Sequence, residues 1–204
     1  MNYASDIAFT DSVKSIQSRK GSRKLYARME MNGGWQTEIT PDLAGYIAAQ
    51  KSFFLGTANA IGQPYIQHRG GPPGFLKVID NKTLAFADYR GNRQFISQGN
   101  LTDNPRAFIF LIDYLNMTRV KVWGSAKVVE DQPGLLSELM PGRDEYRARG
   151  EQVLVFTVEA WDSNCPQHIP QRIDREDAEK LLQERDQRIA ELEQQVRLLK
   201  AKHK

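Results

Sequence analysis

Cysteine is almost absent from the 204-residue sequence, which has a single one, Cys165. One cysteine excludes an intrachain disulfide and any metal site built from several thiolates. The three histidines, His68, His168 and His203, are too scattered in the sequence to predict a zinc or iron site. We therefore expect no metal centre, and we interpret Cys165 as a free structural thiol.

Long apolar runs are also missing. No stretch approaches the roughly 18 residues that a membrane-spanning helix needs. Residues 1–11 carry an early acidic side chain in place of the apolar core of a signal peptide. The formal net charge is only +3, without the clustered basic stripe of a nucleic-acid-binding surface. These absences predict a cytoplasmic protein with neither a membrane nor a nucleic acid as its partner.

What the sequence does contain is a series of short apolar runs separated by Gly, Pro, Asn and Asp. From residue 53 they read FFLGTA, YIQ, FLKVI, TLAFA, AFIFLI and RVKVW, and QVLVFTVEAW follows from residue 152. This spacing is typical of a small antiparallel sheet, and we expect the sheet to close into a barrel.

Helices are expected before and after these strands. Thr40 and Pro41 form a strong helix start, since Thr caps free amides and Pro suits the first turn, and this helix should reach about Gln50. Further helices are predicted over residues 5–20 and 131–140. The Gly-punctuated segment between residues 21 and 35 should be irregular.

The C-terminal segment, residues 175–204, lacks glycine and proline and has a heptad pattern. Leu182, Ile189 and Val196 stand at a-type positions and Leu192 and Leu199 at d-type positions, while Arg185 interrupts the seam. About three heptads predict either a marginal coiled coil or a helix packed on its own barrel. Of the two, we favour a helix that stabilises a dimer.

Basic side chains and glycines gather within residues 53–128, which hold nine basic and four acidic residues. Arg69 precedes a GGPPG turn, and Arg93 lies in the loop YRGNRQ after an apolar strand. Glycine lets the backbone approach an anion closely, and arginine donates charge-assisted hydrogen bonds to phosphate oxygens. We therefore expect a phosphorylated ligand, with Arg93 as its main contact.

Arg119, Lys121 and Trp123 alternate along the run MTRVKVW and therefore share one face of a strand. Such a face suits a planar, electron-poor ring, through hydrogen bonds and stacking. An ordinary solvent-exposed face has the same pattern, so both interpretations stay open.

The run FLKVIDNKTLAFADYRGNRQ, followed by NPRAFIFLI and TRVKVWGSA, resembles the pyridoxamine 5'-phosphate oxidase-like FMN-binding split-barrel superfamily. The resemblance covers about residues 41–172 and rests on the order of these motifs. It implies a homodimer with FMN in clefts between the subunits. The expected fold is mainly β (α+β), a six-stranded antiparallel split barrel with flanking helices and a long C-terminal helix.

By this resemblance, several residues take the family's cofactor-binding roles. Lys77 matches the Lys that contacts FMN, and Arg93 matches the Arg of the basic loop. Ala87 and Asp88 match the strand end near the flavin phosphate.

The sequence also departs from the family pattern. Asn92, Gln94 and Arg119 stand where the family has Ser, a second basic residue and Gln. Gln94 or Arg119 is expected at the polar edge of the flavin, and Arg69 can replace a lost phosphate contact.

The segment around the end of the last strand completes the implied site. The resemblance brings Trp161, Gln167, His168 and Arg172 toward the cofactor. His168 and Arg172 are the candidates for catalytic residues that face a small-molecule substrate, whose identity stays open.

These expectations divide the chain into an N-terminal helix and irregular arm (residues 1–40), an FMN-binding split-barrel domain (41–172) and a C-terminal amphipathic or coiled-coil helix (173–204). The expected function is that of a flavoprotein, an FMN-dependent oxidoreductase acting on a small substrate. The alternative is a non-catalytic module that binds flavin, deazaflavin or haem and recruits a partner through its C-terminal helix.

Overall fold

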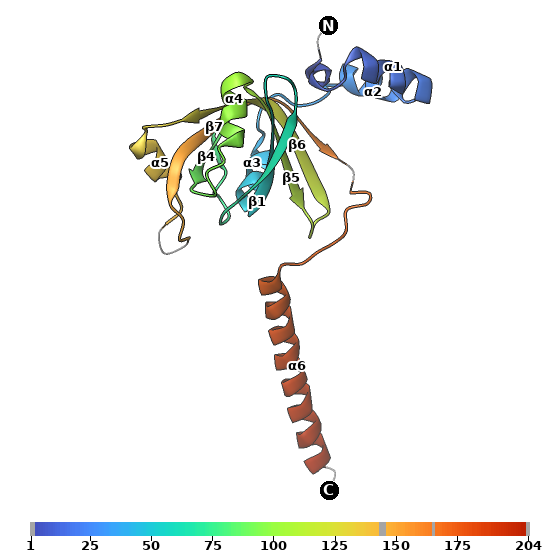
Figure 1. The fold of residues 1–204 in the computed structure, drawn as a ribbon. Coiled ribbons are helices and arrows are strands. Elements are labelled where there is room, and N and C mark those ends of the chain that lie inside the picture. Colours follow the sequence, from blue (N-terminus) through green and yellow to red (C-terminus); the bar gives the residue numbers. More distant parts are fainter. Residues whose placement is uncertain (1–2, 143–145, 165, 203–204) are drawn as a thin grey trace. The chain divides into compact units, whose positions relative to one another are not determined.

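The computed structural model describes residues 3–142, 146–164 and 166–202 (Figure 1). The chain divides into two units, one of Met1–Asp113 with Thr118–Cys165 and one of Tyr114–Met117 with Pro166–Lys204. The second unit contains the C-terminal helix α6 (Arg175–Lys202), as expected. Cys165 and His203 lie outside the described residues. None of the described helices is long and apolar enough to cross a bilayer.

The first unit is built around one antiparallel sheet with the strand order β2-β1-β5-β6-β7-β4-β3. The strands are β1 (Ser52–Ala58), β2 (Pro64–Gly70), β3 (Lys77–Asp80), β4 (Thr83–Tyr89), β5 (Arg106–Asp113), β6 (Thr118–Val129) and β7 (Gly150–Asn164). The expected mainly β split barrel is confirmed. It has seven strands in place of six, because the short strand β3 adds an edge beside β4.

Apolar side chains on the inner face of the sheet form the main core. On β1, Phe53 and Leu55 are buried while Phe54 between them is only half-buried, as alternation in a strand requires. The Phe53 ring centroid lies 5.2 Å from that of Phe86 on β4. Since β1 and β4 lie near opposite ends of the sheet, this contact requires the sheet to curl, as Figure 1 shows.

Helix α3 (Pro41–Ala49) confirms the expected helix start. The Thr40 hydroxyl accepts a hydrogen bond from the backbone N–H of Leu43 at 3.2 Å, and Pro41 occupies the first turn. Leu43 and Ile47 are buried in the main core. The helix therefore packs its apolar face against the sheet.

The N-terminal arm is more helical than predicted. Where one helix and an irregular segment were expected, the structure has a 3-10 turn (Ala4–Ile7), helix α1 (Asp11–Lys20) and helix α2 (Arg23–Met31). Gly21, with φ of 83°, ends α1, but the run RKLYARMEM that follows consists mostly of good helix formers. The glycine therefore marks a boundary between two helices and not an irregular region.

Two further helices flank the sheet. Helix α5 (Pro133–Leu139) confirms the helix predicted over residues 131–140, and it covers a second small cluster of buried residues on the outside of β4 and β7. Helix α4 (Ile96–Asp103), between β4 and β5, was not predicted. Its sequence, ISQGNLTD, has a central glycine and little apolar periodicity.

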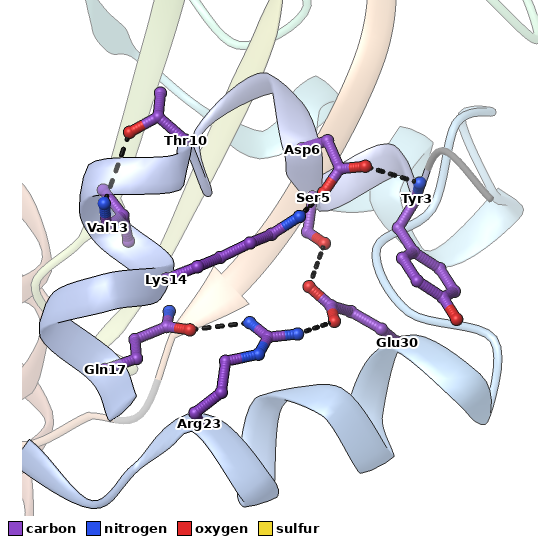
Figure 2. A network of polar contacts seen from close by, with 9 residues as sticks. All are labelled: Tyr3, Ser5, Asp6, Thr10, Val13, Lys14, Gln17, Arg23 and Glu30. Carbon is purple, nitrogen blue, oxygen red and sulfur yellow. Dashed lines mark hydrogen bonds and ion pairs between the residues drawn. The ribbon is translucent and has the colours of Figure 1, made fainter. Parts of the chain in front are cut away.

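A buried polar cluster holds the helices of the arm together (Figure 2). Glu30 on α2 is only 4% exposed. One of its carboxylate oxygens accepts a hydrogen bond from the hydroxyl of Ser5 at 3.1 Å, and the other pairs with Arg23. Arg23 also donates to the side-chain oxygen of Gln17 on α1 at 2.7 Å. The charge of Glu30 is therefore compensated inside the arm.

Aromatic side chains attach the arm to the sheet. The ring of Trp35 stacks on that of Trp123 on β6, with centroids 4.4 Å apart and an angle of 18° between the planes. Phe9 packs against Trp35 at 5.1 Å. Next to this stack, Gln36 forms a β-bridge with Trp161 on β7.

The close approach of β6 to β7 can be tested at Gly124, which lies at an irregularity in the pairing of these two strands. A Cβ atom there would lie 2.0 Å from the carbonyl oxygen of Thr157, a backbone atom with no freedom to move aside. We expect Gly124→Ala to lower the free energy of unfolding by about 3 kcal/mol or more, measured by urea denaturation. The control is Gly45→Ala in helix α3, where a Cβ meets nothing within 4 Å; it should raise stability by about 0.5–1 kcal/mol. Equal effects would contradict the close approach at Gly124.

Candidate functional site

Two of the predicted site residues form an ion pair between the two ends of the curled sheet. Arg69 lies on β2, at one end of the strand order, and Asp88 lies on β4, next to the other end. The guanidinium of Arg69 bonds directly to the carboxylate of Asp88, and both side chains are only 13% exposed. The sequence predicted both residues at the site but not their pairing with each other.

Glutamine side chains and an aromatic ring complete the surroundings of this pair. The amide of Gln152 on β7 donates to Asp88 at 3.0 Å and lies 3.3 Å from the side-chain oxygen of Gln98. The guanidinium of Arg69 lies 5.8 Å from the ring centroid of Phe86. The Nε of Arg69 is buried without a hydrogen-bond partner among the described residues. One buried donor of Arg69 therefore remains available to a ligand.

The loop between β4 and α4 lies beside the ion pair. Arg93 and Phe95 both have positive φ, 61° and 53°, which is uncommon for residues with a side chain. Helix α4 starts directly after Phe95 and has no side-chain cap. The first amides of a helix lack intrahelical acceptors, so this end of α4 is suited to bind an anion.

Arginine side chains outnumber carboxylates around this loop. Arg93 is 53% exposed, and its Nε lies 3.3 Å from the carboxylate of Glu151 on β7. Arg90 and Arg149 lie with Arg93 around a small adjoining cavity of about 220 Å³. Two acidic side chains, Asp88 and Glu151, line the same region, and they pair with Arg69 and Arg93 respectively. Arg90 and Arg149 therefore leave a net positive rim.

The pocket between Arg69 and Arg93 is small. It has room for about 50 Å³, lined by polar side chains that include Gln67 and Ser97 as well as Gln94. The hydroxyl of Ser97, in the first turn of α4, donates to the side-chain oxygen of Gln67 at 2.7 Å. A space of this size suits the phosphate end of a ligand and excludes a large ring system.

An apolar groove of about 990 Å³ lies next to this pocket on the outer face of the sheet, and Tyr65 lines both. Its walls include Phe54, Phe108 and Phe110 from β1 and β5, and Trp123 from β6. The rings of Phe108 and Trp123 meet edge to face at 5.1 Å. The groove therefore offers the aromatic surface that a planar ring requires.

Arg119 and Lys121 share the outer face of β6 with Trp123, as the alternation predicted, because Val120 and Val122 are buried in the core. The Nε of Arg119 is buried without a partner among the described residues. Lys121 pairs in register with Asp162 on β7. Burial raises the pKa of Asp162, and the charge of Lys121 partly opposes this rise.

Other predicted residues lie away from the two cavities. Lys77 on β3 and Ala87 on β4 line neither cavity, and Ala87 is buried in the cluster beneath α5. Trp161 packs partly against the main core, and its indole N–H donates to the carbonyl of Glu38 at 2.7 Å. Trp161 therefore holds the N-terminal arm on the sheet.

Gln167, His168 and Arg172 belong to the second unit of the chain. All three are exposed, and His168 has a φ of 64°. The guanidinium of Arg172 lies 4.6 Å from the ring centroid of Tyr114, and its backbone N–H donates to the Tyr114 carbonyl at 3.2 Å. Both contacts lie within that unit.

Three residues of the site, Gln152, Glu151 and Ser97, were not predicted from the sequence. Gln152 faces Asp88 only because β4 and β7 pair in that register, and the two residues are far apart in the sequence. Ser97 carried the only local signal, a hydroxyl in the segment after a basic loop, but that segment was not predicted to be a helix.

Comparison with known proteins places these features in a family. The sequence profile of the family described as pyridoxamine 5'-phosphate oxidase matches residues 39–165. No curated protein matches the sequence significantly.

Solved structures show similar folds at low identity. HupZ of Group A Streptococcus is similar over 66% of this chain and 99% of its own, at 18% identity and a TM-score of 0.50. An FMN-binding protein of Syntrophomonas wolfei matches over 78% and 98%, at 14% identity and a TM-score of 0.45. HutZ, the haem storage protein of Vibrio cholerae, matches over 62% and 93%, at 15% identity and a TM-score of 0.43. Similarity at these identities concerns the fold alone.

The Arg69–Asp88 pair can be tested through stability. We expect Asp88→Asn to lower the free energy of unfolding by about 3 kcal/mol, because it leaves a buried guanidinium without its counter-charge. The matched control is Glu159→Gln, which breaks the Arg106–Glu159 pair, whose side chains are 64% and 39% exposed. The control should cost less than about 1 kcal/mol. Similar losses in urea denaturation would show that the Arg69–Asp88 pair does not hold the barrel ends together.

Proposed function

The chain belongs to the pyridoxamine 5'-phosphate oxidase family, and from that premise we propose that it is a homodimeric flavoprotein that binds FMN and acts as an oxidoreductase. The observation that carries the proposal is the uncapped start of helix α4 in one pocket with Arg69 and Arg93. Together they form a site for the phosphate group of a mononucleotide.

The described residues fit the phosphate group of FMN. Arg69 has a buried Nε without a partner, and the first amides of α4 have no side-chain cap. Arg93 is half exposed, so it can turn from Glu151 to a ligand at little cost. In this proposal Arg69, Arg93 and the start of α4 hold the phosphate, while Arg90 and Arg149 attract it electrostatically.

The groove beside the pocket fits the ring system. Its aromatic walls include Phe108 and Trp123, and Tyr65 connects it to the phosphate pocket. Arg119 lies on the same face of β6 as Trp123 and has a buried Nε without a partner among the described residues, so it is the proposed donor to the polar edge of the flavin. Lys77 and Ala87 line neither cavity and have no part in the proposal.

A second copy of the chain is proposed to cover this outer face. Ile66 on β2 is 69% exposed and lines the groove together with Phe54 and Phe110. A contiguous apolar face of this kind is typical of an interface, since soluble monomers rarely leave one uncovered. Closing the groove in a dimer would exclude water from the ring and strengthen each polar contact to it.

When bound, FMN supplies hydride or single-electron transfer. The residues of this chain bind its phosphate, orient its ring and keep water away. His168 and Arg172, which belong to the second unit, remain the candidates for substrate contacts.

A non-catalytic binding module is the second candidate. It is favoured by one observation: Arg69 and Arg93 are both paired with carboxylates, which reduces the charge available to a phosphate. A module of this kind would take flavin, deazaflavin or haem in the apolar groove. Steady-state oxidation of NADH or NADPH by the FMN-loaded protein distinguishes the two, since only the enzyme turns over.

Arg93→Ala tests the phosphate site. We expect it to weaken FMN binding by about 1.5–3 kcal/mol, because one charged hydrogen bond is lost. Riboflavin, which lacks the phosphate, should bind both proteins equally. Flavin fluorescence titration measures both affinities, and Arg19→Ala, which removes an exposed arginine of α1, is the control for charge alone. Unchanged FMN affinity would remove Arg93 from the site.

The dimer face is tested in a chain that ends at Arg172, since neither hydrophobic cluster contains a residue of α6. We expect this chain to be a dimer and Ile66→Asp to make it a monomer, because a carboxylate cannot be buried in an apolar interface. Sedimentation velocity measures the state. Ile61→Asp, at a position 90% exposed that does not line the groove, should stay dimeric. A dimer that survives Ile66→Asp would place the interface elsewhere.

A further inference from the structure

Helix α6 has a row of apolar side chains without cover. Leu182, Ile189, Leu192, Val196 and Leu199 are all between 43% and 57% exposed. The 28-residue helix is joined along its surface by ion pairs such as Arg175–Glu179 at 2.6 Å, each of which contributes only a few tenths of a kcal/mol. Most helices in proteins are stabilised by packing an apolar face, so α6 requires a partner surface.

The residues of this row determine which partner fits. Ile189 and Val196 stand at consecutive a positions, and Leu192 and Leu199 at consecutive d positions. Among parallel coiled coils, β-branched residues at a with Leu at d favour two strands. We propose that α6 forms such a coiled coil, in register, with α6 of a second copy of this chain.

The charges beside the seam favour the parallel direction. In a parallel pair, Arg188 at g lies opposite Glu193 at e of the second copy, once on each side of the seam. In an antiparallel pair that aligns the same apolar layers, Asp186 lies opposite Glu193, and two acids repel. Arg188 is bonded to Glu191 on its own helix at 2.9 Å, and both side chains are more than 60% exposed. Replacing this exposed ion pair by one to Glu193 of the second copy therefore costs little.

Arg185 at a d position is compatible with this arrangement. Its aliphatic stem can cover the seam while the guanidinium extends to the edge of the interface. In the parallel pair the neighbouring e position of the second copy is Asp186, which supplies an opposite charge. An interruption of this kind weakens the coiled coil at its start and leaves the layers from Ile189 to Leu199 to hold it.

The coiled coil would act together with the barrel interface and does not depend on FMN. Two chains joined at α6 hold their barrels at a local concentration of roughly millimolar. The dimer would then persist at dilutions at which the barrel faces alone separate. A parallel pair also starts both helices at the same end.

Disulfide crosslinking in the full-length chain tests the proposal. Cys165→Ser first removes the natural thiol, and Leu199→Cys then places one cysteine at a d position. In a parallel pair the two cysteines face each other, whereas in the antiparallel pair they lie about 25 Å apart, at 1.5 Å per residue. Under mild oxidation we expect the Leu199→Cys chain to crosslink at least about tenfold faster than a Gln194→Cys chain, because d residues meet across the seam and position 194, at f, faces away.

Each other outcome overturns part of the proposal. Crosslinking between Leu182→Cys and Leu199→Cys chains, without Leu199→Cys homodimers, would show an antiparallel pair. Equal rates for Leu199→Cys and the Gln194→Cys control would show that α6 is not paired with a second α6. Repeating the experiment with Ile66→Asp separates the two interfaces: crosslinking should persist there even if the barrel face does not dimerise, and FMN binding is measured independently.

Discussion

The ion pair between Arg69 and Asp88 joins two strands that share no backbone hydrogen bond. Adjacent strands of the sheet are joined by backbone ladders, whereas β2 and β4 lie near opposite ends of the strand order and meet here through side chains. The ring of Phe53 packs on Phe86 in the core directly beneath this closure. The Arg69–Asp88 ion pair and the Phe53–Phe86 contact therefore both join the two ends of the sheet, and the ion pair lies in the candidate site.

This arrangement links stability to binding. A phosphate that binds beside Arg69 must share the guanidinium with Asp88, and one that binds Arg93 must displace Glu151. The start of α4 carries no carboxylate cap, so its amides are free of this competition. Within the described residues, the carboxylates of Asp88 and Glu151 thus neutralise the site before a ligand arrives. The backbone amides at the start of α4 are the donors that a ligand can bind without displacing either carboxylate.

The parts of the fold that could be predicted are those with a local physical cause. The Thr40–Pro41 start, the alternating burial along β1 and β6 and the extent of α6 follow from residues within a few positions of each other. The site could be predicted only in composition. Arg69 and Asp88 were expected there, but their pairing and the partnership of Asp88 with Gln152 depend on strand order and register, which the sequence does not display. Trp161 was expected near the cofactor from the family resemblance, and the hydrogen bond from its indole N–H to the carbonyl of Glu38 joins positions more than 100 residues apart, which no local pattern displays.

The attachment of the N-terminal arm has an optical consequence. All three tryptophans of the chain, Trp35, Trp123 and Trp161, lie where the arm crosses β6 and β7, and Trp123 also forms a wall of the apolar groove. The intrinsic emission of the protein therefore arises almost entirely from one neighbourhood. Detachment of the arm and filling of the groove both change the surroundings of the same indoles, so the chain carries a built-in spectroscopic reporter of both events.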